Sequence, residues 1–199
     1  MNTGVKLKFA DSEHVSLASH PDYDEAWLEN LIRDKVSLLG LGNLDVVSAQ
    51  KSQSRGGRLD LLLRDSKNQI NFVVELMLGT LDETHIVRTI EYWLRERSQK
   101  GNDDYDHIAV LAAEDVLGNR FVDVVRFLSQ QMPLVLLEIH ALRVEDRLTV
   151  QFIRVFDGRD TVLGDSTDGW LIFRLTGEGL DNNKALLGEI CKTACEEWT

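Results

Sequence analysis

The sequence predicts an α/β protein in which helices and strands alternate along the chain. Apolar residues recur at every third or fourth position over 22–39 and 81–97, the period of an amphipathic helix. Strongly apolar runs at 59–63, 70–76 and 107–113 are typical of buried strands. With 199 residues, of which 43% are hydrophobic and 28% charged, the chain has an ordinary globular composition and can bury a core.

The first elements are a long helix and a short strand. The helix is expected to run to about Leu39 from Asp22 or Asp24, because either side chain can accept hydrogen bonds from the first turn. A strand over 44–49 and a polar loop over 50–57 follow.

Two apolar strands joined by a polar turn come next and predict a hairpin over 59–76. A second long helix over 81–97 follows, with Asp82 able to cap it. The remaining patterns predict a strand at 107–113, a helix at 117–130, and strands at 134–142 and 148–156. We expect one domain over 1–157 and a strand-helix extension over 158–199 that packs on the same domain.

Each hairpin strand carries one acid where its pattern calls for an apolar residue, Asp60 in the first strand and Glu75 in the second. A buried carboxylate is costly unless it meets a metal, a cation or several hydrogen-bond donors. Two acids on paired strands would suit a divalent cation that prefers oxygen ligands. The alternative is that each acid pairs with an arginine, for which Arg58, Arg64 and Arg88 are available.

The order Gly57-Arg58-x-Asp60, fourteen further residues, Glu75-x-Met77 and a helix resembles the core motif of the PD-(D/E)XK nuclease superfamily. The resemblance implies a restriction-endonuclease-like core with the order αβββαβ, a mixed central sheet and flanking helices. It also implies Mg²⁺ or Mn²⁺ held by Asp60, Glu75 and the main-chain carbonyl of Leu76. Met77 occupies the position of the superfamily's catalytic lysine, and methionine can neither donate a proton nor carry a charge.

Further site residues follow from the same resemblance. Glu29, on the first helix, is the candidate for an additional acid at the metal, with Glu25 as a competitor, and the alternative is a solvated ion pair with Arg33. Arg58, His85 and Arg88 are the candidates for contacts with the substrate. For His85 the alternative is a partly buried side chain that makes one hydrogen bond.

The charge of the chain is acidic overall but not around these residues. The net charge is −11, yet residues 51–100 hold nine Lys or Arg and seven Asp or Glu, a local charge of +2 that leaves −13 elsewhere. The net charge argues against a non-specific nucleic-acid coat, whereas its distribution is compatible with DNA at the site. Two cysteines and the lack of a long apolar run favour a cytoplasmic protein without a membrane segment.

The function that the sequence favours is a Mg²⁺-dependent DNA endonuclease or nuclease-like protein. The resemblance suggests a restriction, defence or mobile-element setting, and a homodimer or a protein partner is compatible with it. The alternative is a nuclease fold that has lost catalysis and serves as a nucleic-acid-binding or protein-interaction subunit, which Met77 and the overall acidity would favour.

Overall fold

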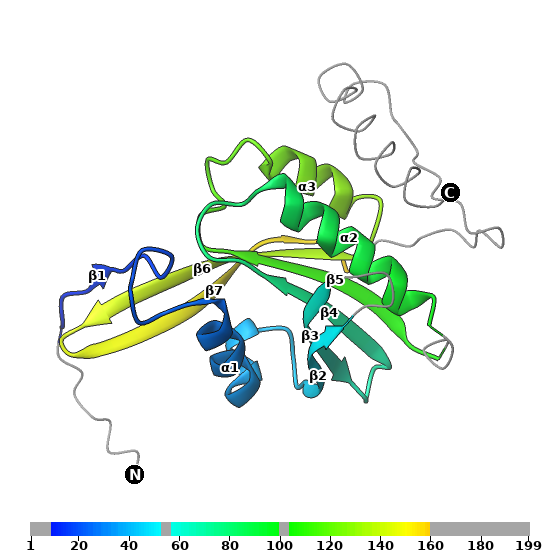
Figure 1. Ribbon diagram of the computed structural model, residues 1–199, viewed down its shortest axis with the longest axis horizontal. Helices are drawn as coiled ribbons and strands as arrows, with labels where there is room; N and C mark the ends of the chain where they lie inside the picture. The colour runs from blue at the N-terminus through cyan, green and yellow to red at the C-terminus, as the bar shows by residue number, and fades with distance from the viewer. Residues whose placement is uncertain (1–8, 53–56, 100–103, 160–199) are drawn as a thin grey trace, which may run out of the picture.

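A seven-stranded mixed sheet forms the centre of the computed structural model, which describes residues 9–52, 57–99 and 104–159 (Figure 1). The strands are β1 (Glu13–His14), β2 (Asp45–Ser52), β3 (Arg58–Asp65), β4 (Ile70–Leu76), β5 (Asp106–Ala113), β6 (Leu134–Val144) and β7 (Arg147–Asp157). The helices are α1 (Glu25–Asp34), the short 3₁₀ helix η1 (Val36–Leu39), α2 (Glu83–Arg97) and α3 (Val122–Ser129).

The strands lie in the order β1-β6-β5-β4-β3-β2. Strands β5 and β1 pair with successive parts of one edge of β6, and β7 pairs with its opposite edge. Strands β4, β5 and β6 run parallel, whereas β2, β3 and β4 form an antiparallel meander and β6 and β7 form a hairpin. This arrangement confirms the expected mixed sheet. The elements α1, β2, β3, β4, α2 and β5 follow one another in the predicted order αβββαβ.

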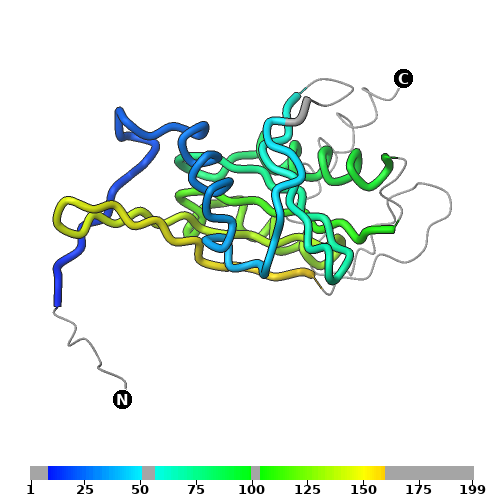
Figure 2. Tube along the Cα trace, turned by 90° about the horizontal axis from the view of Figure 1, so that it is seen from below, coloured from blue at the N-terminus to red at the C-terminus, as the bar shows by residue number. Residues whose placement is uncertain are grey.

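Helices cover both faces of the sheet, α1 on one and α2 with α3 on the other, while the end of the β6–β7 hairpin projects beyond them (Figures 1 and 2). Side chains alternate between the two faces along a strand. Phe72 and Val74 of β4 belong to the apolar cluster that contains α1 residues. Val73 and Met77 belong to the cluster that contains α2 and α3 residues. Glu75 lies between Val73 and Met77 on the same face of the strand, so its side chain projects toward α2.

Two helices are shorter than their apolar patterns predict. The first begins at Glu25 with Asp24 as its cap and ends at Asp34, because the backbone of Lys35 leaves the helical region before the 3₁₀ turn. The helix expected over 117–130 begins only at Val122. Gly118 adopts a φ of +89°, which a helix cannot accommodate.

Asp82 caps α2 as expected, since its Oδ1 accepts a hydrogen bond from the main-chain N–H of His85 at 2.9 Å. At the other end of the helix, the indole N–H of Trp93 donates to the carbonyl of His107 at 2.7 Å and ties α2 to β5. In the part of the chain that the structure describes, no helix is long and apolar enough to cross a membrane. The extension predicted for 158–199 lies outside the described residues from position 160 onward.

Asp82→Ala is expected to lower the free energy of unfolding by about 1 kcal/mol, because the first turn of α2 loses its side-chain acceptor. Chemical denaturation measures the change. Asp82→Asn is the matched control, since asparagine caps a helix about as well as aspartate. Equal losses in both variants would mean that the charge of Asp82, not its capping bond, matters.

Candidate active site

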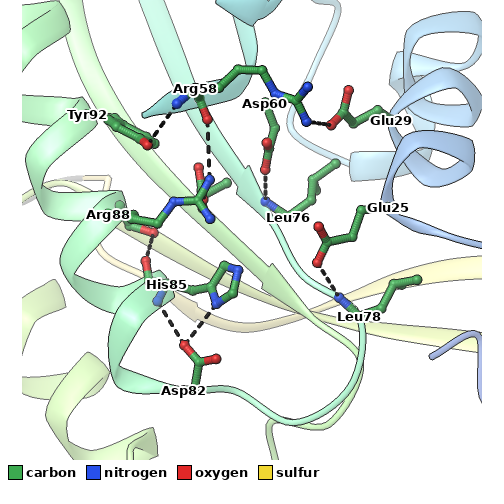
Figure 3. Close-up of polar contacts among 12 residues, drawn as sticks. Glu25, Glu29, Arg58, Asp60, Leu76, Leu78, Asp82, His85, Arg88 and Tyr92 are labelled. Atoms are coloured by element: carbon green, nitrogen blue, oxygen red, sulfur yellow. Dashed lines mark hydrogen bonds and ion pairs between the residues drawn. The ribbon is translucent and has the colours of Figure 1, made fainter. Parts of the chain in front are cut away.

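The candidate site lies where β3 and β4 separate. Their paired register ends at Leu61 and Val74, and the next residues on the two strands are Asp60 and Glu75. The main-chain N–H of Leu76 donates to Oδ2 of Asp60 at 2.8 Å (Figure 3). A side chain on β3 is therefore hydrogen-bonded to the main chain of β4. Both acids are buried, with exposures of 7% for Asp60 and 1% for Glu75. The structure therefore brings the two predicted acids together.

Glu75 is the least satisfied polar side chain of the site. The guanidinium Nη2 of Arg88 lies 2.7 Å from its Oε1, a contact that is an ion pair when the carboxyl of Glu75 is ionised. This contact lacks hydrogen-bond geometry, and neither carboxylate oxygen of Glu75 has a hydrogen-bond partner among the described residues. A buried acceptor without a donor is expensive, so this carboxylate has unused capacity to bind a cation or a donor.

Burial and nearby negative charge raise the pKa values of both acids. Desolvation is the main cause for Glu75, whose pKa rises to about 9, and the charge of Asp60 adds to it while Arg88 opposes it. Desolvation also raises the pKa of Asp60, to about 6, against the lowering effect of the hydrogen bond from Leu76. The two carboxyls are thus hard to ionise together unless additional positive charge is present.

The arginine that meets Glu75 is Arg88, which projects from α2 toward β3 and β4 (Figure 3). For Glu75, the alternative of pairing with an arginine is therefore present in the structure. Arg64 instead donates to Asn71 at 2.8 Å and stacks on the ring of Tyr105. Arg58 lies 4.0 Å from Glu29 and exposes 55% of its side chain.

Glu29 reaches the site from α1. It is 3% exposed, and its Oε2 accepts a hydrogen bond from Nε2 of Gln50 at 2.8 Å. The solvated ion pair with Arg33 is wrong, because Glu29 is buried and Arg33 donates to Asn30. The charge of Glu29 contributes to the raised pKa of Asp60, which places it within electrostatic range of that carboxylate.

Glu25 lies one turn before Glu29 on α1, and its Oε1 is 3.5 Å from the main-chain N–H of Leu78 just after β4 (Figure 3). Its charge also adds to the raised pKa values of Asp60 and Glu75. Both acids of the first helix therefore face the site, and Glu25 is the more exposed of the two.

Met77 is 3% exposed and lies in the apolar cluster beneath α2. Its main-chain N–H donates to the carbonyl of Ala112 at 3.0 Å and continues the alignment of β4 with β5. The side chain of Met77 therefore contributes to packing.

His85 lies in the first turn of α2. Its Nδ1 is 2.8 Å from Oδ1 of Asp82, and 16% of its side chain is exposed. This environment matches the alternative of a partly buried histidine with one side-chain hydrogen bond. The remaining ring nitrogen is the only polar atom that His85 can offer to a substrate.

Among the described residues, no group of three or more His, Cys, Asp or Glu side chains is arranged to hold a metal ion. Asp60 and Glu75 would therefore contribute two carboxylates to a site completed by other oxygens. Mg²⁺ commonly binds to proteins in this way, with one or two carboxylates, water and substrate phosphate.

Apart from the candidate site, a polar cavity of about 430 Å³ lies beyond the carboxyl ends of β4 and β5. It was not predicted from the sequence. His140, on its wall, contacts Oε2 of Glu138 at 2.8 Å. The other oxygen of Glu138 accepts from two main-chain N–H groups, and Glu114 accepts from the N–H groups of Ala18 and Gly79. These acids already have donors and hold loops together. The sequence signal that could have revealed this cavity resembles that of the candidate site, an acid within an apolar strand (Glu138) or directly after one (Glu114).

Comparison with protein-family models gives no match, and comparison with curated proteins gives none either. Among solved structures, the chain is similar to one titled "Structure of EndoMS-dsDNA2 complex", with a TM-score of 0.43 and 18% identity over 52% of this chain and 41% of that chain. It is also similar to a repair endonuclease from Pyrococcus abyssi, with a TM-score of 0.43 and 16% identity over 54% of this chain and 45% of that chain. The matched part is less than half of either neighbour, so the chemistry of this chain has to be inferred from its own residues.

Proposed function

We propose that the chain is a metal-dependent nuclease of the PD-(D/E)XK type that hydrolyses phosphodiester bonds in DNA. The observation that carries the proposal is the buried pair Asp60 and Glu75, in which Glu75 has two oxygens without hydrogen-bond partners. Arg88 provides one positive charge to this pair, and ionising both acids requires a further cation to offset the cost.

The residues fit a hard divalent cation. Asp60 and Glu75 would hold Mg²⁺ or Mn²⁺, with the carbonyl of Leu76 as the main-chain ligand. When bound, such an ion lowers the pKa of a coordinated water and offsets negative charge on a phosphate. The chain itself provides oxygen ligands only, which is the donor set that Mg²⁺ prefers over softer metals.

The substrate contacts would come from two arginines. Arg58 exposes 55% of its side chain beside the acids, and Arg88 exposes 32%. Guanidinium groups bind phosphate oxygens through two parallel hydrogen bonds, so both residues suit the backbone of a nucleic acid. Arg88 would also be the cation nearest the reacting phosphate, since Met77 is packed in the core.

Glu29 has a supporting role in this proposal. It is held by Gln50 and lies 4.0 Å from Arg58, so it orients that guanidinium at the edge of the site. It is also available as an acceptor for a water near the metal, a role that the sequence resemblance suggested.

The decisive experiment is cleavage of plasmid, linear and single-stranded DNA with Mg²⁺ or Mn²⁺, with Asp60→Ala as the matched variant. The parent is expected to cleave at least one substrate only when metal is added, and the variant is expected to lose this activity because it lacks one of two metal ligands. Calorimetric titration with Mn²⁺ runs alongside. A parent that neither cleaves DNA nor binds Mn²⁺ would disprove the proposal.

A second candidate is a nuclease fold without catalysis that serves as a binding subunit. The observation in its favour is Met77, buried where a lysine would assist the attacking water. This candidate predicts that the parent binds Mn²⁺ and DNA but cleaves none of the three substrates. The two candidates thus share the metal site and differ in turnover.

A further inference from the structure

The main chain of Arg58, at the start of β3, is held by two side chains of α2. Its N–H donates to the hydroxyl oxygen of Tyr92 at 3.1 Å. Its carbonyl accepts a hydrogen bond from Nη2 of Arg88 at 3.3 Å (Figure 3). Residues 88 and 92 lie four positions apart, one above the other on the same face of the helix.

These contacts lie where the sheet itself gives little support. The register of β3 with β4 begins only at Leu61, so Arg58 and Asp60 precede the paired part of the hairpin. On the other side, Arg58 pairs with Ser52, the last residue of β2. The side chains of α2 therefore provide the contacts that fix this end of β3 on the side of β4.

Gly57 allows this contact to form. A Cβ atom at this position would lie 2.3 Å from the hydroxyl oxygen of Tyr92, and the φ of Gly57 is +81°. Both the space and the backbone conformation favour glycine. The Tyr92 hydroxyl thus rests directly against the main chain at Gly57, three residues before Asp60.

Arg88 extends the same arrangement to the second acid. Its Nη2 contacts both the carbonyl of Arg58 and Oε1 of Glu75, and its guanidinium lies 5.6 Å from the ring centre of Tyr92. One face of α2 therefore reaches the start of the strand that carries Asp60 and the end of the strand that carries Glu75.

We propose that Tyr92 is a positioning residue of the metal site, whose hydroxyl, with Gly57 and Arg88, fixes the start of β3 so that Asp60 lies beside Glu75. The inference rests on the proposed metal site and assigns to it a residue that lies outside the motif. Tyr92 is 2% exposed, so its hydroxyl acts on the main chain and not on a substrate.

Tyr92→Phe tests the role, because it removes the hydroxyl and keeps the ring in the core. We expect its dissociation constant for Mn²⁺, measured by calorimetry, to rise about tenfold, as is typical when a residue that orients metal ligands is lost. The amide of Arg58 should exchange with solvent faster, since its acceptor is gone. In the cleavage assay, kcat should fall while KM for DNA stays within about twofold of the parent value.

Tyr105→Phe is the matched control, because Tyr105 stacks under Arg64 away from the acids and loses the same atom. It should leave Mn²⁺ affinity and Arg58 exchange unchanged. Thermal unfolding of both variants separates a local change from a general loss of stability.

Gly57→Ala provides an independent test. It should also weaken Mn²⁺ binding, because the new methyl group collides with the Tyr92 hydroxyl. Adding Tyr92→Phe to Gly57→Ala removes the atom that lies nearest to the new methyl group. The double variant should still bind Mn²⁺ more weakly than the parent. Its loss of binding free energy should be smaller than the sum of the losses in the two single variants.

The outcomes separate the two proposals. If the parent binds Mn²⁺ and Tyr92→Phe binds it equally well, the positioning role is wrong and the proposed function stands. If Arg58 exchanges at the parent rate in Tyr92→Phe, the positioning role is also wrong. If the parent itself binds no Mn²⁺, the proposed metal site fails, and the positioning of that site fails with it.

Discussion

Glu75→Gln is expected to make the metal-free protein more stable than the parent at about pH 8, by about 3 kcal/mol, and to change little near pH 5. The carboxyl of Glu75 is 1% exposed, and burial raises its pKa to about 9 from an ordinary value of 4.5. Glutamine has the same shape as the protonated acid and does not ionise.

The sign of this effect follows from proton binding. Between pH 4.5 and about 9, the folded parent holds a proton on Glu75 that the unfolded chain releases. The stability from this difference is fully present below pH 4.5 and is lost as the pH rises toward 9. Glu75→Gln does not lose stability in this way, so the difference in free energy of unfolding between the variant and the parent grows with pH. Urea denaturation in the presence of a chelator, repeated across this range, measures it.

Glu138→Gln is the control of opposite sign. Burial acts to raise the pKa of Glu138, but hydrogen bonds from Leu117, His140 and Val116 outweigh it and the net pKa is lowered. The parent should therefore be more stable than Glu138→Gln at neutral pH, and this difference should shrink as the pH falls below 4.5. If the stability curves of Glu75→Gln and the parent ran parallel from pH 5 to pH 8, the unusual pKa of Glu75 would be contradicted.

Met77→Lys, which introduces the lysine of the motif that the sequence resembles, is expected to lower the free energy of unfolding by about 3 kcal/mol without increasing cleavage. Met77 is 3% exposed within the apolar cluster beneath α2. A lysine there must either bury its ammonium group or lose its proton. Arg88 already contacts Glu75, the carboxylate that such a lysine would approach.

Denaturation and the DNA cleavage assay together check this prediction, with Met77→Leu as the control for packing alone. Leucine conserves volume and polarity and should cost less than about 1.5 kcal/mol. A Met77→Lys protein that remained as stable as the parent and cleaved DNA faster would show that position 77 opens onto the site, contrary to its burial in the core.

Much of the fold could be predicted because the strands are unusually apolar. The runs at 59–63 and 70–76 have no plausible place outside a buried sheet, and β3 and β4 contain them. The helix expected over 117–130 is longer than α3, because its predicted start rests only on the spacing of apolar residues. Leu117 is 61% exposed, and Gly118 turns the chain before α3 begins.

The partners of the site residues depended on contacts that sequence spacing does not reveal. Glu29 has Arg33 within one turn, but it turns inward to Gln50, a residue whose φ of +53° interrupts the regular course of β2. Three arginines were available to the two acids, and only the packing of α2 on the sheet selects Arg88. The acids themselves were predictable because a charge within an apolar strand is visible in the sequence.

The two-residue strand β1 covers part of one edge of β6. Beyond Glu138, the edge of β6 is no longer paired with β5, and β1 covers part of it through His14 opposite Leu142 and Glu13 opposite Arg143. Bare strand edges are templates for pairing between molecules and for aggregation. A chain shortened to begin at residue 16 would expose this edge on the projecting hairpin. Its tendency to form oligomers or precipitate, and not the geometry of Asp60 and Glu75, is the property that such a truncation would change first.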